Sequence, residues 1–400
     1  MSKLSFMEKL LDGVEVQWLP LGDVTNIKTG AAVSKSKIEK NPGEFPVINS
    51  GREPLGFINE FNIENDPIGI TSRGAGVGSI TWQEGKYYRG NLNYSVTLKD
   101  GANLKVRYLY HLLLEMQSAI HGLCTFQGIP ALNAGNLKGL EIPIPCPDNP
   151  KKSLEIQAEI VRILDAFTAM TAELTAELNL RKQQYNHYRD QLLRFEEGEV
   201  EWKTLEEVAH FSNGKGHEKD ISEDGRYIVV NSKFISTDGG VAKFSNSQIC
   251  PLYKDDILLV MSDLPNGRAL SKTFIVEEDD RYTLNQRIGG ITVKNNKELL
   301  PKFLHYFLDR TPQLLKHDSG VDQTNLRKGQ ILEVKVPMIS PLKQAQIVEI
   351  LDKFDTYTKS ISEGLPREIE LRQKQYEYYR DRLLSFPEPT KPGAKQEAAA

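Results

Sequence analysis

Two stretches of the chain repeat apolar residues every three or four positions, which is the spacing of an amphipathic helix. They are Ser153–Phe195 and Ser340–Phe386. The predicted apolar seam of the first consists of Ile156, Ile160, Ile163, Phe167, Met170, Leu174, Leu178, Tyr185, Tyr188 and Leu192. That of the second consists of Ile347, Ile350, Phe354, Tyr357, Ile361, Ile369, Tyr376, Tyr379 and Leu383. Gly364-Leu365-Pro366 interrupts the second seam and predicts a kink or break there.

The two stretches are copies of one another, so the chain contains an internal repeat. QAEIVRILDAF is answered by QAQIVEILDKF, and LRKQQYNHYRDQLLRF by LRQKQYEYYRDRLLSF. The repeat extends outward, because EVQW at 15–18 is answered by EVEW at 199–202. NAGNLKGLEIPIP is answered by NLRKGQILEVKVP, which places Asn133 opposite Asn325 and Glu141 opposite Glu333. The order is cyclic and predicts a pseudo-two-fold molecule.

Each predicted helix is a rod of roughly 60 Å with one narrow apolar stripe. Two such rods most simply bury their stripes against each other as an antiparallel coiled coil. The alternative is that each helix packs only on its neighbouring domain. A tandem TAELTAEL, Thr171–Leu178, adds four residues to the seam, which is a stutter that locally unwinds a coiled coil.

Between the helices, short β-rich runs alternate with Gly, Asn and Pro. Expected strands include 46–48, 68–71, 79–82, 94–98 and 256–260, with helices at 106–120 and 301–315. The predicted fold class is α+β, with two β-rich globular domains separated by the two long helices. The predicted divisions are 1–150 (with a short helical lead-in, 1–13), 151–197, 198–339, 340–386 and a disordered tail, 387–400.

Composition narrows the class of protein. With 400 residues and 39% hydrophobic content, the chain can form two or three domains with real cores. No apolar run approaches the ~20 residues that span a membrane. Its three cysteines form neither a CxxC pair nor an even framework, which favours reduced thiols and a cytoplasmic location. The net charge of −4 is spread evenly, which disfavours a nucleic-acid binder that relies on bulk charge.

Motifs for catalysis are missing from the sequence. It contains no G-x-x-x-x-G-K-S/T phosphate loop and no H-E-x-x-H metal motif, and its seven histidines lack metal-ligand spacing. The glycines of RGAGVGSI, at 73–80, precede a predicted strand instead of a helix, so a dinucleotide site is disfavoured. No catalytic residue, cofactor or metal site is predicted. The glycine-rich loop is better suited to approach DNA or a protein partner closely.

Loops of both predicted domains carry side chains that can read bases, since Arg and Lys bond guanine while Asn and Gln bond adenine in the major groove. The candidates in 1–150 are Lys28, Arg52, Arg73, Lys86, Arg89, Asn91, Asn93 and Gln127. Those in 198–339 are Lys215, Lys233, Asn266, Arg268, Gln286, Arg287, Gln323 and Arg327. For each residue the alternative is a solvated loop side chain.

Two variable domains, each closed by a strand ending in IPIP or VPMI and followed by QAEIVRILD or QAQIVEILDKF, resemble the specificity subunit of a type I restriction–modification system. The resemblance covers the whole chain. TAELTAEL and EGLPREIELRQKQYEYYRD resemble the type IC branch in particular. The variable domains match the family only in their framework, so the bases that they read cannot be carried over.

The resemblance implies that each variable domain is a target recognition domain, which reads one half of a bipartite, asymmetric site in double-stranded DNA. The helices would set the spacing and dock two modification (methyltransferase) subunits, which restriction subunits join to cleave DNA with ATP. The chain itself would catalyse nothing. Charged residues on the helices are candidates for partner contact, with solvation as the alternative: Arg181, Lys182, Arg189, Arg372, Lys374 and Arg380.

Two other classes remain open on the sequence. A coiled-coil adaptor whose two β-rich domains bind protein would have the same architecture, and the even charge balance favours it mildly. A stand-alone nuclease or methyltransferase would need a site that the sequence does not reveal.

Overall fold

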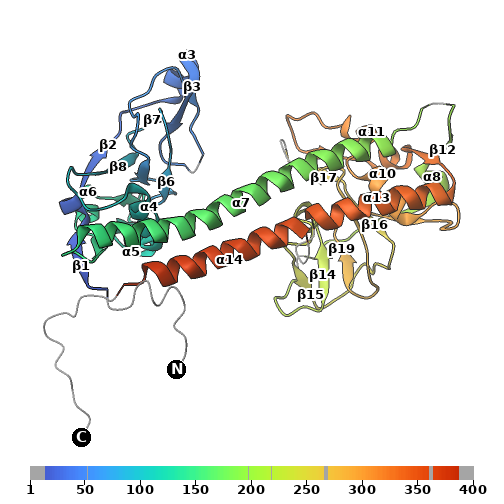
Figure 1. Ribbon diagram of the computed structural model, residues 1–400. Coiled ribbons are helices and arrows are strands. Elements are labelled where there is room, and N and C mark those ends of the chain that lie inside the picture. Colours follow the sequence, from blue (N-terminus) through green and yellow to red (C-terminus); the bar gives the residue numbers. More distant parts are fainter. Residues whose placement is uncertain are drawn as a thin grey trace, which may run out of the picture. The chain divides into compact units, whose positions relative to one another are not determined.

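The computed structural model (Figure 1) describes residues 14–51, 53–196, 198–217, 219–264, 269–359 and 364–386. The chain divides into two units. Unit 1 contains the described residues up to Glu173 together with those from Glu370 onward, and unit 2 contains those from Leu174 to Ile369. The predicted lead-in helix (1–13) and the predicted disordered tail (387–400) lie outside the described residues.

Unit 1 contains three small sheets and a hairpin. A four-stranded antiparallel sheet has the order β2 (Thr25–Thr29), β8 (Asn93–Leu98), β5 (Ile68–Thr71) and β6 (Ile80–Trp82). A three-stranded sheet has the order β4 (Phe57–Ile58), β3 (Pro42–Ile48) and β7 (Tyr88–Arg89), with β3 and β7 parallel. β1 (Val16–Pro20) pairs with β11 (Glu141–Pro145), and β9 (Cys124–Thr125) with β10 (Ala131–Leu132).

Unit 2 repeats this topology strand for strand in its two larger sheets. The four-stranded sheet has the order β13 (Ala209–Asn213), β20 (Ile288–Val293), β16 (Ile257–Val260) and β18 (Thr273–Ile275). The three-stranded sheet has the order β15 (Phe244–Ser245), β14 (Tyr227–Val230) and β19 (Tyr282–Leu284), with β14 and β19 parallel. β12 (Glu201–Thr204) pairs with β22 (Lys335–Met338), and β17 (Ser262–Asp263) with β21 (Thr324–Asn325). The predicted internal repeat is confirmed.

Short helices connect these strands. In unit 1 they are α2 (Leu21–Val24), α3 (Lys35–Lys40), α4 (Val106–Glu115), α5 (Gln117–Gly122) and α6 (Ala134–Lys138). In unit 2 they are α8 (Leu205–Val208), α9 (Ser232–Ser236), α10 (Pro301–Leu308), α11 (Pro312–Leu315) and α12 (Lys328–Leu332). Both predicted domain helices, 106–120 and 301–315, are present but are broken into two pieces. α4 and α10 each turn one apolar face into the core of their unit.

The long helices are α7 (Pro150–Leu192), α13 (Pro341–Lys359) and α14 (Gly364–Leu384). The predicted interruption of the second stretch is confirmed, because α13 and α14 are separate helices. Gly364 has φ +78°, and a Cβ there would lie 2.6 Å from the carbonyl oxygen of Thr356. Glycine is required at this position because only it adopts a positive φ at little cost and leaves room for that oxygen.

Within each unit, α7 packs against part of the second long stretch. In unit 1, Phe167 of α7 stacks on Tyr379 of α14 with ring centroids 5.0 Å apart. In unit 2, Tyr188 of α7 stacks on Phe354 of α13 at 5.6 Å, and Arg181 lies over the Tyr357 ring. The contact partner of the later α7 residue, Tyr188, comes earlier in α13 than the partner of Arg181. The two helices therefore pair antiparallel, as predicted.

The alternative packing is also present, so the helices have two apolar faces. Ile160 and Leu164 of α7 are fully buried in the core of unit 1, and Ile347 and Leu351 of α13 are buried in that of unit 2. The seam pattern omitted Leu164 and Leu351. It included Met170 and Ile350, which are 39% and 40% exposed. The predicted seam was therefore partly wrong, because each helix packs against a domain as well as a helix.

The strand register corrects one alignment of the repeat. Trp18 lies opposite Pro143 in the β1–β11 pair, and Trp202 lies opposite Pro337 in the β12–β22 pair. Pro143 therefore corresponds to Pro337, so Glu141 corresponds to Lys335 and not to Glu333 as expected. Likewise the residue that precedes α6, Asn133, corresponds to Arg327, which precedes α12. Strand pairing determines which residues face the core, whereas local sequence similarity does not.

Candidate nucleic-acid interface and helix-docking site

Two loops of unit 1 are joined into a platform at its surface. The glycine-rich loop after β5 is bonded to the β9–β10 hairpin, because the Gly74 amide donates to the Pro130 carbonyl at 2.9 Å. The Leu132 amide donates to the Ser72 carbonyl at 2.8 Å, and the backbone of Arg73 forms an antiparallel β-bridge with that of Ala131. The loop leads into strand β6, as predicted, so it does not form the helix N-terminus of a dinucleotide site.

Unit 2 builds the same platform from different residues. Ser262 and Asp263 of β17 pair with Asn325 and Thr324 of β21. The Leu326 amide donates to the Met261 carbonyl at 2.7 Å, which is the counterpart of the bond between Leu132 and Ser72. The loops of both platforms are thus held by backbone hydrogen bonds that are independent of side-chain identity, which allows the loop sequences to differ.

Most of the predicted base-reading residues that the structure describes are exposed. They are Lys28, Arg73, Lys86, Asn91, Gln127, Lys215, Lys233, Gln286, Arg287, Gln323 and Arg327. Arg73 and Gln127 lie on the platform of unit 1, while Gln323 lies on that of unit 2 and donates to Ser262 Oγ at 2.8 Å. Lys86 instead lies 4.6 Å over the Phe61 ring and near Glu64. Arg52, Asn266 and Arg268 lie outside the described residues.

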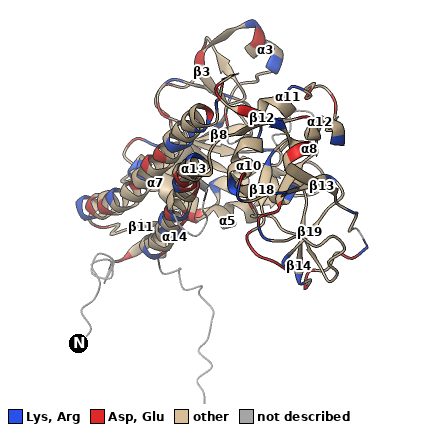
Figure 2. Ribbon diagram, turned by 90° about the vertical axis from the view of Figure 1, so that its right-hand side faces the viewer, with Lys and Arg blue, Asp and Glu red and all other residues tan. Residues whose placement is uncertain are grey.

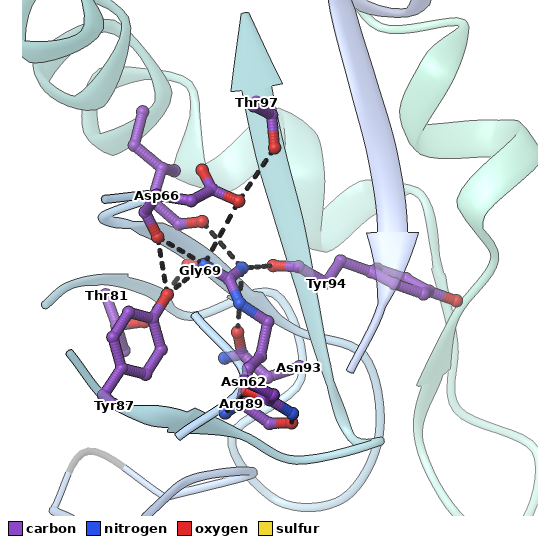
Figure 3. Close-up of polar contacts among 10 residues, drawn as sticks. Asn62, Asp66, Gly69, Thr81, Tyr87, Arg89, Asn93, Tyr94 and Thr97 are labelled. Atoms are coloured by element: carbon purple, nitrogen blue, oxygen red, sulfur yellow. Dashed lines mark hydrogen bonds and ion pairs between the residues drawn. The ribbon is translucent and has the colours of Figure 1, made fainter. Parts of the chain in front are cut away.

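Arg89 and Asn93 were wrongly included among the candidates, because each is only 1% exposed. Figure 3 shows the Arg89 guanidinium surrounded by oxygen atoms from separate strands and loops. It donates to the carbonyl oxygens of Ile68 (2.9 Å), Tyr94 (2.7 Å) and Asp66 (2.6 Å), and it also contacts the Tyr87 hydroxyl. Arg89 lies on β7, so it ties the three-stranded sheet to the four-stranded one.

The surroundings of Arg89 are closed to solvent. Burial raises the pKa of Tyr87 to about 12, and the nearby Arg89 partly opposes that rise. The Tyr87 hydroxyl donates to the Asp66 carbonyl at 2.6 Å. A buried guanidinium with this many partners holds the domain together and is not available to a base.

A buried glutamine joins each domain to its long helix. Gln157 accepts from the Lys105 amide at 2.8 Å and donates to the Asn103 carbonyl at 2.9 Å. Gln344 accepts from the Leu300 amide at 2.7 Å and donates to the Glu298 carbonyl at 2.8 Å. Both side chains are fully buried. Lys105 and Leu300 precede α4 and α10, so each glutamine fixes the start of a domain helix.

Two turns further along each long helix, an aspartate also bonds to side chains of the domain helix. Asp165 accepts from Arg107 and from His111, both at 2.8 Å. Asp352 accepts from Lys302 at 2.7 Å and from the Tyr306 hydroxyl at 2.6 Å. Burial lowers the pKa of His111, against the opposing effect of Asp165, and burial also raises the pKa of Tyr306. Neutral His111 therefore donates from Nε2 to Asp165, while Nδ1 lies 3.2 Å from the Tyr376 hydroxyl of α14.

The sequence carries a signal for these contacts, because a glutamine and an aspartate recur at the same places in both helical copies. Gln157 and Asp165 both occur in QAEIVRILD, and Gln344 and Asp352 occur at the same places in QAQIVEILD. A polar residue repeated on the apolar side of two helices indicates a buried hydrogen bond.

The comparisons with known proteins agree with this duplicated arrangement. A family described as the type I restriction modification DNA specificity domain matches residues 13–181 and 197–371. The chain belongs to this family of specificity proteins.

Individual relatives match the specificity protein over nearly its whole length. It is 39% identical to the EcoR124I/EcoR124II type I restriction enzyme specificity subunit of Escherichia coli, over 97% of this chain and 99% of the relative. It is 31% identical to a putative type I restriction enzyme specificity subunit of Haemophilus influenzae, over 96% and 98%. The fold is similar to that of the type I restriction–modification S subunit of M. genitalium, with a TM-score of 0.59 at 19% identity, covering 95% and 98%.

The predicted partner-binding residues of the chain fall into three groups. Arg380 is not an open surface charge, because its Nε donates to Glu115 at 2.6 Å and so ties α14 to α4 within unit 1. Arg189 and Lys182 line a cavity of about 830 Å³ within unit 2, between α7, α10 and α13. Arg181 pairs with Glu177, Arg372 bonds Gln375, and Lys374 pairs with Glu370, each along its own helix.

The charges of the specificity protein are mixed. Figure 2 shows Lys and Arg interspersed with Asp and Glu along α7, with no continuous basic stripe. Within the ranges that the structure describes, no group of three His, Cys, Asp or Glu is placed to hold a metal ion. In those same ranges, no helix is long and apolar enough to cross a bilayer.

The buried position of Arg89 generates a test. Replacing it by alanine leaves three carbonyl groups and Asp66 without their cation, so the Arg89→Ala change should lower the free energy of unfolding by about 3–5 kcal/mol. The matched control is Arg73→Ala, at an exposed position, which should change it by less than about 0.5 kcal/mol. Urea unfolding of the full chain measures both. Equal effects of the two substitutions would mean that Arg89 has no structural role.

Proposed function

We propose that this chain is the DNA-specificity subunit of a type I restriction–modification complex, in which each unit reads one half of a bipartite, asymmetric site. The observation that supports this most strongly is that one strand topology occurs twice with different loops. A duplicated scaffold with divergent loops is suited to reading two different short sequences. Family membership over most of the chain supports the same conclusion.

We further propose that the chain takes no part in catalysis and supplies recognition to subunits that carry the chemistry. The E. coli relative is named as a specificity subunit of a type I restriction enzyme. The sequence offers no phosphate loop and no metal motif, and its base-reading candidates lie in loops. Since positive and negative charges on this chain nearly balance, bound modification subunits would supply much of the affinity for the phosphate backbone.

The experiment that tests this function is methylation mapping. The chain is co-expressed with its modification subunit in cells that lack other methyltransferases, and modified adenines are mapped across the genome. The expected result is one asymmetric motif, made of two short half-sites around a fixed unread gap and dependent on this chain. A stable complex with an active partner but no motif would favour the adaptor that binds protein.

The long helices are proposed to dock the modification subunits through charges that unit packing leaves at the surface. Lys182 and Lys374 are exposed on α7 and α14, whereas Arg380 already binds Glu115. In an Arg380 variant, loss of partner binding could therefore not be separated from loss of the contact between α14 and α4.

Charge reversal at exposed positions avoids that difficulty. The double change Lys182→Glu and Lys374→Glu should reduce the amount of modification subunit that co-purifies with the chain, because two attractive charges become repulsive. The matched control is Lys40→Glu, at an exposed lysine of α3 away from the long helices. Undiminished co-purification of the double variant would show that these lysines are merely solvated.

The tandem TAEL sequence is proposed to set the distance between the half-sites. Thr171–Leu178 lies inside the continuous helix α7, and half of its residues are exposed while the other half are partly buried. A third unit of four residues would lengthen the helix by ~6 Å, which is one or two base pairs at ~3.4 Å each.

Methylation mapping of the insertion variant should therefore give a gap longer by one or two base pairs between unchanged half-sites. The matched control is Glu173→Gln, which alters the composition of the same segment without altering its length and should leave the gap unchanged. A changed half-site in the insertion variant would sink the hypothesis.

A further inference from the structure

In each unit, the loop that leads into the last platform strand, β10 or β21, presents an aliphatic side chain to solvent. Among the described residues of unit 1, the most exposed large hydrophobic side chain is Ile129, at 67%. Among those of unit 2 it is Val321, at 76%. Each follows a glycine with positive φ, Gly128 (+85°) or Gly320 (+67°). A single exposed aliphatic residue is ordinary, but its recurrence after a positive-φ glycine in the same loop of two divergent domains requires a reason.

The turn that carries each residue directs it away from the domain and toward solvent. A positive φ lets the chain reverse sharply, and a Cβ on Gly128 or Gly320 would meet no atom within 4 Å, so both turns project into open space. In unit 1 the hairpin is closed below the tip by the Thr125 hydroxyl, which donates to the Ala131 carbonyl at 3.2 Å.

The corresponding loop of unit 2 is closed by a different side chain. Asp318 accepts from the Gly320 amide at 3.0 Å and from the Thr324 hydroxyl at 3.1 Å. The backbone pairing of Asp263 with Thr324 then anchors the loop on the platform. Two different sets of side chains thus close the corresponding loops, each of which carries an exposed aliphatic residue.

Burial within the domain does not explain these residues, because exposing them to water stabilises nothing in the folded chain. The polar neighbours indicate the occupant. Arg73 and Gln127 are exposed on the platform of unit 1, and these side-chain types bond base edges. Gln323 is exposed on the platform of unit 2, where its amide nitrogen donates to Ser262 Oγ and its amide oxygen is left to accept. In the major groove, the apolar group that a base edge offers to an aliphatic side chain is the C5-methyl of thymine.

We propose that Ile129 and Val321 are specificity-determining residues, each packing against a thymine methyl group in the half-site that its unit reads. This inference rests on the proposed function. It assigns each aliphatic tip to direct base contact and the flanking Arg and Gln side chains to hydrogen bonding around it.

The test uses the complex of this chain with its modification subunit, after methylation mapping of the unaltered chain has defined the site. Binding is measured to the native duplex and to duplexes in which uracil replaces the thymines of one half-site, which removes only the methyl groups. Each contacted methyl should contribute about fourfold in affinity, as expected for about 0.8 kcal/mol per buried group. Ile129→Ala should weaken binding to the native duplex by about that factor.

The decisive result comes from combining each protein variant with each uracil-containing duplex. The Ile129→Ala complex should be insensitive to uracil in the half-site read by unit 1 but remain sensitive in the other half-site. Val321→Ala should show the reverse pattern, and Ile129→Val should retain most of the sensitivity. The matched controls are Val106→Ala and Leu342→Ala, which remove exposed aliphatic side chains outside the platforms and should leave both sensitivities intact.

Three outcomes would overturn the inference while leaving the proposed function in place. They are a half-site without any A·T pair, a native complex that ignores uracil, and an Ile129→Ala complex that remains as sensitive as the native one. Weaker binding by Ile129→Ala without any uracil effect would instead favour a wedge between base steps. The absence of any mapped motif for the unaltered chain would contradict the proposed function itself.

Discussion

The buried amide of one glutamine in each unit determines how a recognition domain is attached to its long helix. Gln157 and Gln344, whose own side chains are fully buried, satisfy the amide and carbonyl groups beside the starts of α4 and α10. Leaving such groups unpaired would cost about 1–3 kcal/mol each. Asp165 and Asp352 add a second polar contact further along, and Leu164 and Leu351 lie between them in the apolar core. Polar and apolar contacts together therefore fix each domain to its long helix.

This attachment is repeated with changes that a duplication tolerates. His111 in unit 1 is replaced by Tyr306 in unit 2, and both donate to the equivalent aspartate. The stacked pair of Phe167 with Tyr379 is repeated by Phe354 with Tyr188. In contrast, the ion pair of Arg380 with Glu115 has no such counterpart, because the corresponding residues are Arg189 and Arg310, which line a cavity. The two units thus share the contacts between domain and helix, including the ion pairs of Asp165 with Arg107 and of Asp352 with Lys302, and differ at the ion pair between Arg380 and Glu115.

The two platforms follow an opposite rule, since their framework is backbone and their side chains differ between the units. In both units, main-chain hydrogen bonds join the loop after the central strand to the loop before the last short helix. Such bonds do not depend on side-chain identity, so the loops can change sequence without loss of the platform. Residues that stitch the sheets together, such as Arg89, are excluded from this freedom because they are buried.

The sequence by itself determined the internal repeat, the two long helices, the break near Gly364 and most of the strands, because periodic apolar patterns and glycine or proline breaks are local signals. It also placed the base-reading candidates in loops. Only the tertiary structure decided that Arg89 and Asn93 are buried, that Leu164 and Leu351 face a domain, and that Glu141 corresponds to Lys335. Each of these depends on contacts between segments far apart in the sequence. An arginine beside tyrosines looks the same in a sequence whether it faces solvent or the carbonyls of a distant strand, and periodicity does not say which neighbour an apolar face will meet.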